Sequence, residues 1–377
     1  MRSDLRICHL PDLHVGIPGR EAAVERSLSL IIDGVYTTKP DAVVIPGDLM
    51  DGLSSIADRN LLGWFLFELS LVAPVFVIPG NHDRPGDLRV FGLIPRVTVY
   101  ETPTVETVLD GRLLLMALPH LAKGALVTEG DIDGSNRDSE ARIREILADF
   151  GRQREAHSQP ALLMCHLDIR GRQLSNGETR AGQGIAVSVA DLLSSGADYI
   201  AAGHIHMAQQ LDPRLAYGGS AARGNFGEAD PKSWNIVTLQ GKGALPVIER
   251  QPLPLRPMFT VERTLDNAAG TWSQTDGPPE ADIPADAEVR VRLVAPETRM
   301  AEIALERATV LERWGDAKVE AKTIRQAAVR SEAIGRAETE DEMLRAYWAH
   351  ESVETPSPEF QGRALGALAE ILQEVGA

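Results

Sequence analysis

Five short polar clusters carry the side chains that could do chemistry in this 377-residue chain. They follow one another as Asp12-Leu13-His14, Gly47-Asp48, Gly80-Asn81-His82-Asp83, His166, and Gly203-His204-Ile205-His206. Residues two apart in an extended chain point the same way, so each Asp-x-His or His-x-His pair can hold one ion. The glycines before Asp48, Asn81 and His204 permit the tight turns that such a site needs.

Two carboxylates, one amide oxygen and four imidazoles are candidate metal ligands: Asp12, Asp48, Asn81, His14, His166, His204 and His206. Seven ligands are too many for one ion and suit two. The mixed nitrogen and oxygen set favours Mn²⁺, with Fe²⁺, Mg²⁺ or Zn²⁺ as alternatives. Two ions about 3.5–4 Å apart can share a water, lower its pKa and clamp a phosphate. Asp48 is the natural bridge, because one carboxylate can give an oxygen to each ion.

His82 lies between the candidate ligand Asn81 and the acid Asp83. A further metal ligand there would crowd its neighbour. We predict that His82 is catalytic and donates a hydrogen bond to the phosphate or the leaving oxygen, with Asp83 orienting its imidazole. Asp51 is expected to support the site from behind the ligands. The remaining histidines, His9, His120, His157 and His350, are expected to be ordinary core or surface residues.

Each cluster is common by chance when taken alone, but each of these follows an apolar run. The runs at 5–10, 42–46 and 74–79 alternate with helix-like stretches at about 20–36 and 58–71. That alternation is typical of a sheet with helices on its faces, and ligands bind beyond the carboxyl ends of such strands. Later strands at 160–166 and 197–204 lead into the last two clusters. Together they predict a two-layered sheet domain with helices outside it.

The length suggests two domains, at about 100–200 residues each. Residues 251–258 contain three prolines and no periodicity, which predicts a linker after a 1–250 domain. A smaller α+β domain is expected at 259–355. Its expected elements are strands at 289–294 and 317–324, helices at 297–314 and 340–350, and an exposed loop at 271–287.

Residues 356–377 are predicted to form an amphipathic C-terminal helix. Its apolar face would carry Leu365, Leu368, Ala369 and Leu372. Such a helix either packs on its own domain or docks a partner. A second candidate interface lies at 53–62, where Leu61, Leu62 and the nearby Phe65 suit a dimer contact or the core equally well.

The chain carries 38 basic and 54 acidic residues, a net charge of −16. This charge opposes bulk attraction to DNA or to an anionic membrane, although two divalent ions would reverse it locally. The two cysteines, Cys8 and Cys165, sit in apolar runs and are expected to be reduced and buried, as in a cytoplasmic protein. The N-terminus lacks a continuous apolar segment, and Leu61–Pro79 is interrupted, so neither a signal peptide nor a membrane span is predicted.

The five clusters, in this order, resemble the calcineurin-like metallophosphoesterases. That resemblance implies a metal-dependent phosphodiesterase with a four-layer α/β/β/α sandwich. It places the family's metal ligands on the seven residues named above and its catalytic histidine on His82.

More of the chain resembles the bacterial SbcD nucleases. The matching pieces are ICHLPDLHVG at the start, GDLMDG, YGGSAARGNFGEADPKSWNIVTL at 217–239 and EDEMLRAYW at 340–348. This resemblance implies a capping domain at 259–355 and Mn²⁺-dependent cleavage of DNA ends and hairpins, by 3′–5′ exonuclease and endonuclease action, in double-strand break repair. It also implies a homodimer and an SbcC-type coiled-coil ATPase partner.

Two other functions fit the same residues. One is a phosphoesterase for a small molecule or a phosphoprotein, which the net charge of −16 favours. The other is a DNA-end sensor or ATPase adaptor with a vestigial site, although all seven candidate ligands are present.

Overall fold

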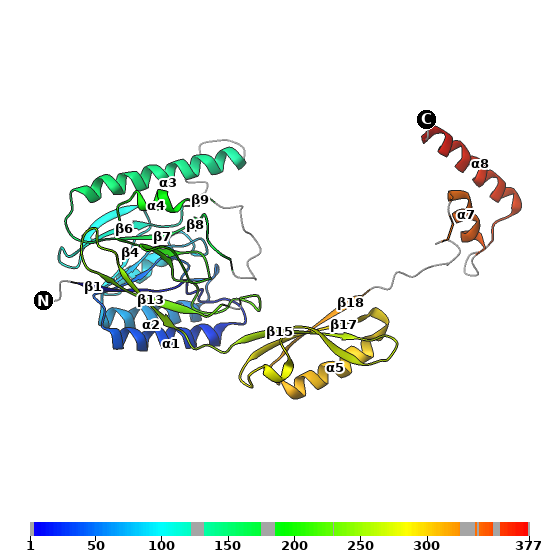
Figure 1. Ribbon diagram of the computed structural model, residues 1–377, viewed down its shortest axis with the longest axis horizontal. Coiled ribbons are helices and arrows are strands. Elements are labelled where there is room, and N and C mark those ends of the chain that lie inside the picture. Colours follow the sequence, from blue (N-terminus) through cyan, green and yellow to red (C-terminus); the bar gives the residue numbers. More distant parts are fainter. Residues whose placement is uncertain are drawn as a thin grey trace. The chain divides into compact units, whose positions relative to one another are not determined.

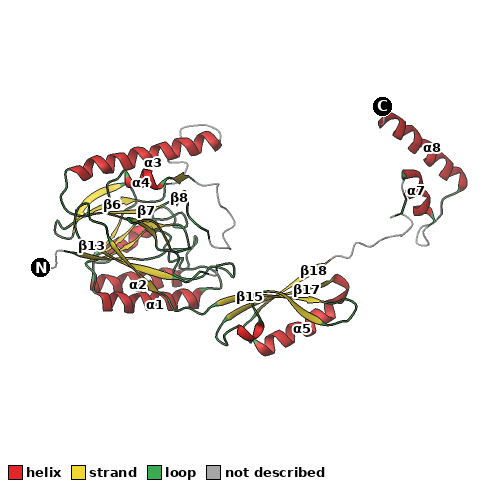
Figure 2. Ribbon diagram, viewed as in Figure 1, coloured by secondary structure: helices red, strands yellow, loops and turns green. Residues whose placement is uncertain are grey.

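The computed structural model describes residues 4–121, 132–174, 185–228, 230–324, 336–337, 339–349 and 355–375. Contacts divide the chain into two units, residues 1–260 with 278–290 and residues 261–277 with 291–377. Figures 1 and 2 show the elements of each unit.

The first sheet of the larger unit has four parallel strands and two antiparallel strands added at one edge. Its strands, in order across the sheet, are β14 (Val247–Pro252), β13 (Ser233–Leu239), β1 (Leu5–His9), β2 (Ala42–Ile45), β3 (Val75–Val77) and β4 (Val97–Val99). Helices α1 (Glu21–Thr38) and α2 (Ile56–Val72) connect β1 to β2 and β2 to β3 and cover the outer face (Figure 1). The alternation of helix and strand expected from the sequence is therefore confirmed.

The second sheet also has six strands, four of them parallel. Its order is β11 (Gln209–Asp212), β12 (Leu215–Tyr217), β10 (Tyr199–Gly203), β7 (Ala161–His166), β6 (Leu113–Leu118) and β5 (Thr104–Val108). Helices α3 (Ile132–Glu155) and α4 (Val189–Leu193) cover its outer face. Smaller elements of the unit are η1 (Asp87–Leu93), β8 (Asp168–Ile169) and β9 (Ala186–Val187).

The two sheets pack face to face, and the strands are buried on both sides. In β2, Ala42 and Val44 join the core between the sheets, whereas Val43 and Ile45 face the helices. This is the two-residue period of a strand with two apolar faces, and it explains the continuous apolar runs. The four-layer α/β/β/α sandwich is confirmed.

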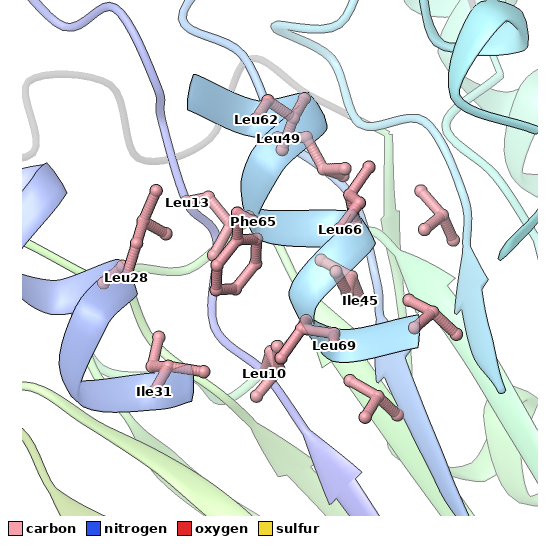
Figure 3. Close-up of a cluster of buried hydrophobic side chains, with 14 of the residues drawn as sticks. Leu10, Leu13, Leu28, Ile31, Ile45, Leu49, Leu62, Phe65, Leu66 and Leu69 are labelled. Atoms are coloured by element: carbon pink, nitrogen blue, oxygen red, sulfur yellow. The ribbon is translucent and has the colours of Figure 1, made fainter. Parts of the chain in front are cut away.

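Apolar side chains fix the helices that support the site's loops. Figure 3 shows Leu28 and Ile31 of α1 and Leu62, Phe65, Leu66 and Leu69 of α2 gathered against Leu10, Leu13, Ile45 and Leu49. Burying one such side chain contributes about 1.5–3 kcal/mol. Leu62 and Phe65 are fully buried, so these two side chains belong to the core and are not available for a dimer contact.

The smaller unit is built on a four-stranded sheet in the order β16 (Trp272–Asp276), β15 (Met258–Leu265), β17 (Glu288–Pro296) and β18 (Lys318–Ile324). Its helices are η4 (Glu297–Arg299), α5 (Met300–Arg313), α7 (Glu340–Trp348) and α8 (Pro358–Val375). The predicted loop at 271–287 is wrong in part, because it contains β16 and η3 (Glu280–Asp282). The segment of β16 is polar and mostly exposed, so it lacks the apolar alternation by which strands are recognised.

The predicted linker is shorter than expected. Pro252 ends β14 and Met258 begins β15, which leaves 253–257 between the strands. Leu253 is buried and its N–H donates to the Lys232 carbonyl. The division into two units does not test the domain limits at 1–250, 259–355 and 356–377, which stay predictions.

Two smaller expectations concern the whole chain. Cys8 and Cys165 are both free and buried, as predicted. Within the part of the chain that the structure describes, no helix is long and apolar enough to cross a membrane.

Candidate metal centre

The five polar clusters meet where strands of both sheets end. Asp12 and His14 follow β1, Asp48 follows β2 and Asn81 follows β3, whereas His166 ends β7 and His204 follows β10. Main-chain groups connect the clusters, since the His204 N–H donates to Asp12 Oδ2 (2.8 Å) and the His82 N–H donates to Asp48 Oδ1 (2.8 Å). All seven predicted ligands are therefore brought to one place.

The first ligand group consists of Asp12, His14 and His206, whose candidate ligand atoms lie within 4.8 Å of one another. The Nε2 atoms of His14 and His206 face each other at 2.9 Å. Asp12 Oδ1 is buried and has no hydrogen-bond partner among the described residues. Burial raises the pKa of the Asp12 carboxyl to about 7. A buried carboxylate oxygen without a donor, beside two facing ring nitrogens, fits a bound cation.

The second ligand group consists of Asp48, His166 and His204. The expectation that His204 and His206 hold one ion together is wrong, because their ring nitrogens fall in different groups. Asn81 Oδ1 completes it, 2.9 Å from His166 Nε2 and 2.8 Å from His204 Nδ1. His166 Nδ1 donates to the Pro46 carbonyl (2.7 Å), which directs Nε2 into the group. Burial alone would lower the pKa of His166, but the Asp48 and Asp12 carboxylates raise it to about 9.

Asp48 lies between the two groups. Its Oδ2 is 3.2 Å from His166 Nε2 and 3.7 Å from His14 Nε2. Burial would raise the pKa of this carboxyl, but the neighbouring His166 and His14 lower it below its usual range. The position suits the bridging role expected of Asp48.

The glycines before the ligands are required for space more than for turns. Of the three, Gly47 has a positive φ (105°). A Cβ added at Gly47 would lie 2.2 Å from His166 Nδ1, one at Gly80 2.2 Å from Asp48 Oδ1, and one at Gly203 2.2 Å from the Pro46 carbonyl oxygen. The ligand loops therefore pack too closely for any side chain at these positions.

Backbone strain also gathers at the ligands. His14, Asp48 and His204 have φ values of 47°, 50° and 99°, a region that residues with a side chain rarely occupy. Such strain persists where the surrounding structure holds the chain in place, and it is typical of functional sites.

Asp51, and not Asp83, orients His82. Asp51 Oδ1 lies 2.9 Å from His82 Nδ1 and 3.1 Å from His14 Nδ1. The Asp83 carboxylate instead accepts hydrogen bonds from the N–H groups of Leu49, Met50 and Gly80. The predicted contact between Asp83 and His82 is therefore wrong, because these adjacent side chains reach different partners. Asp83 connects the loop that carries Asp48 to the loop that carries Asn81. Asp51 lies behind His14 and His82, in the supporting position expected of it.

Two residues at the site had no role assigned from the sequence. His120 lines a cavity of about 140 Å³ together with His166 and His204. Glu228 Oε1 lies 3.4 Å from His206 Nδ1. Of the other histidines, His9 is buried against Tyr199 and His157 contacts Gln159, whereas His350 lies outside the described residues. Glu228 lies 22 positions beyond His206, so it belongs to none of the short polar clusters and the sequence gives no sign of its contact with His206.

Residues 5–208 match the family model described as calcineurin-like phosphoesterase. The chain belongs to this family. A curated relative, the SbcD component of nuclease SbcCD from Escherichia coli (strain K12), is 23% identical over 72% of this chain and 74% of its own length. The DNA double-strand break repair protein Mre11 of Aeropyrum pernix is 23% identical over 71% of this chain and 66% of its own length. The DNA double-strand break repair protein Mre11 of Methanosarcina mazei is 24% identical over 73% of this chain and 42% of its own length.

Membership gives the site its general chemistry. Calcineurin-like phosphoesterases are metal-dependent hydrolases with a dimetal centre. The first and second ligand groups are two sets of Asp and His side chains that can each hold an ion. The seven residues thus fit the group that the family uses.

Proposed function

We propose that this protein is a Mn²⁺-dependent DNA end-processing nuclease. It would hydrolyse phosphodiester bonds as a 3′–5′ exonuclease and as an endonuclease on hairpins and single strands, in double-strand break repair in the cytoplasm. The observation that carries the proposal is the match, over about seven tenths of the chain, to relatives named as part of a nuclease and as double-strand break repair proteins.

Each site residue has a definite task in this proposal. Two bound ions would supply an activated water and charge compensation for the phosphate. Asp12, His14 and His206 would hold one ion, His166, His204 and Asn81 would hold the other, and Asp48 faces both groups.

His82 acts from outside the ligand set. Its side chain is 44% exposed, and Asp51 binds its Nδ1. That contact leaves Nε2 free to donate to the phosphate or to the leaving oxygen. Asp83 has no part in this step and serves as a brace between the two ligand loops.

The test is degradation of end-labelled linear and hairpin DNA by the purified protein, with Mn²⁺ and with EDTA. We expect cleavage with Mn²⁺ and none with EDTA. His157→Ala, a change at a histidine that contacts Gln159, is the matched control and should cleave like the wild type. A protein that binds Mn²⁺ but leaves both DNA substrates intact would contradict the proposal.

A phosphoesterase for a small molecule or a phosphoprotein is the second candidate. The net charge of −16 favours it, because long-range repulsion opposes DNA binding. Hydrolysis of nitrophenyl phosphoesters without cleavage of DNA would select this function. If DNA is the substrate, binding should weaken steeply with added salt.

We also propose that the protein acts as a homodimer. The outer surface of α2 carries Trp64, Phe67 and Leu71, which are 44%, 46% and 55% exposed. They are spaced three and four residues apart, so they share one face of the helix. A second copy of the chain would cover this face. Phe67→Glu should convert a dimer to a monomer in sedimentation, whereas a monomeric wild type would contradict the proposal.

An SbcC-type coiled-coil ATPase is the proposed partner, because the Escherichia coli relative is named as one part of nuclease SbcCD. We propose α8 as its docking segment. Leu365 and Leu368 are half-buried, and the side chains of Ala369 and Leu372 lie outside the described residues. Deleting 356–377 should abolish binding of the ATPase and leave Mn²⁺-dependent cleavage of short DNA. Unfolding of the truncated chain would instead support packing of α8 on its own domain.

A further inference from the structure

We propose that Glu228 and Lys232 form a buried positioning pair that fixes His206 and so determines how tightly the first ligand group holds its metal ion. This inference rests on the metal centre proposed above. It concerns residues that lie behind the ligands, in the segment between β12 and β13.

The pair holds His206 by both its side chain and its main chain. Glu228 Oε1 lies 3.4 Å from His206 Nδ1, and Glu228 Oε2 lies 2.7 Å from Lys232 Nζ. The same Nζ donates to the His206 carbonyl oxygen at 3.2 Å. Glu228, Lys232 and His206 therefore each contact the other two.

Glu228 is itself held rigidly. Its Oε1 also accepts hydrogen bonds from the Gly224 N–H and from Asn225 Nδ2, each at 3.2 Å. Glu228 and Lys232 are each only 2% exposed. Lys232 Nζ has a second carboxylate, Asp230, at 3.0 Å. A carboxylate fixed by this many donors has one position to offer to the imidazole.

The consequence lies on the far side of the His206 ring. When Nδ1 carries the proton and donates it to Glu228, Nε2 presents its lone pair to the first ligand group, where it lies 2.9 Å from His14 Nε2. A carboxylate behind a ligating histidine fixes its tautomer and ring orientation and makes it a stronger donor to the metal. Glu228 should therefore act on one metal position and leave the other unchanged.

The rival interpretation is that the pair only stabilises its loop. The chain offers a matched control in Asp198 and Arg154, which are 2% and 3% exposed and lie 2.8 Å apart. The Asp198 carboxylate also accepts hydrogen bonds from the N–H groups of Ala161 and Gly243. Asp198 and Arg154 thus form a buried acid–cation pair in the same unit, and this pair hydrogen-bonds to main-chain groups and not to a candidate metal ligand.

The experiment is a Mn²⁺ titration of the full chain by calorimetry, with free Mn²⁺ followed in parallel by its paramagnetic resonance signal. The variants are Glu228→Gln and Asp198→Asn, and thermal unfolding is measured in EDTA. We expect wild type to bind two ions. Glu228→Gln should lose about 10–100-fold in affinity at one position and nothing at the other. Asp198→Asn should unfold at a lower temperature and keep both affinities.

Different results overturn different statements. If Glu228→Gln binds both ions as wild type does, or if Asp198→Asn loses the same affinity, the positioning role is wrong while the metal centre stands. If wild type binds no Mn²⁺, the proposed function fails together with this inference. Should Glu228→Gln not fold, the double variant Glu228→Gln with Lys232→Met removes both charges and must show the same loss at one position.

Discussion

The two ligand groups use the same kinds of side chain but are supported in different ways. In the first group, Asp51 lies behind His14 and Glu228 lies behind His206, at 3.1 Å and 3.4 Å. In the second group, the support behind His166 is the main-chain carbonyl of Pro46, at 2.7 Å. A carboxylate behind the imidazole makes the other ring nitrogen a stronger electron-pair donor to a metal ion. A carbonyl fixes the orientation of the ring but adds no charge. The first group should therefore be the one that substitutions behind the ligands can weaken.

Asp48 is the residue at which this difference should disappear, because its Oδ2 faces both groups. For Asp48→Asn we expect the largest effect, with both Mn²⁺ affinities reduced and phosphodiesterase activity lost. Equilibrium dialysis against Mn²⁺ and an activity assay measure the two effects. Asp41→Asn is the control, because Asp41 lies just before β2 and its carboxylate contacts Arg112. Loss at one position alone would assign Asp48 to a single group.

His82 should separate catalysis from metal binding. For His82→Ala we expect the hydrolytic rate to fall about 10²–10⁴-fold, the usual contribution of a general acid or base. Both Mn²⁺ affinities should remain, since the His82 side chain belongs to neither ligand group and meets the centre only at its edge, against the His14 ring and Asp51. Single-turnover cleavage, measured beside a Mn²⁺ titration, checks both statements. A variant that cleaves as fast as the wild type would rule out this role for His82.

Asp51 should reveal the asymmetry directly. Asp51→Asn removes the charge behind His14, so we expect the first position to lose about 10–100-fold in Mn²⁺ affinity. The second position should be unchanged, because a side-chain substitution does not remove the Pro46 carbonyl. Asp87→Asn, which breaks an exposed pair with Arg59, provides the control. Equal loss at both positions would show that the groups do not differ in the way we infer.

The part of this centre that could be predicted from the sequence is the part encoded locally. Asp12, Asp48, Asn81 and His166 each end or follow an apolar strand, so the pattern places them at a sheet edge without any knowledge of tertiary contacts. The fold class follows from the same alternation.

What could not be predicted depends on contacts between distant segments. Nothing in the order His82-Asp83 shows that the first residue meets Asp51 while the second caps the N–H groups of Leu49 and Met50. Glu228 reaches His206 only because the segment after β12 folds back on the site. The strand β16 escapes prediction for a different reason, since a polar edge strand has no apolar face to detect.

Asp12 should give the effect whose sign is the most informative. Its Oδ1 is buried without a donor in the described part of the chain, and burial raises the pKa of the carboxyl, although the neighbouring His166 opposes this. Asparagine can still accept from the His204 N–H and carries no charge, so in EDTA we expect Asp12→Asn to raise the free energy of unfolding by about 1–3 kcal/mol, because burial penalises the charged carboxylate.

Asp198→Asn should change stability in the opposite direction, because it leaves the buried Arg154 without its partner and costs about 3–5 kcal/mol. With Mn²⁺ at about 100 times its dissociation constant, an ion at the first position adds about 2.7 kcal/mol to the stability of wild type, which Asp12→Asn should largely lose. Urea unfolding with and without Mn²⁺ measures both signs. If Asp12→Asn unfolds more easily than wild type in EDTA, Asp12 is satisfied in the metal-free protein, and the first group is not held ready for a cation.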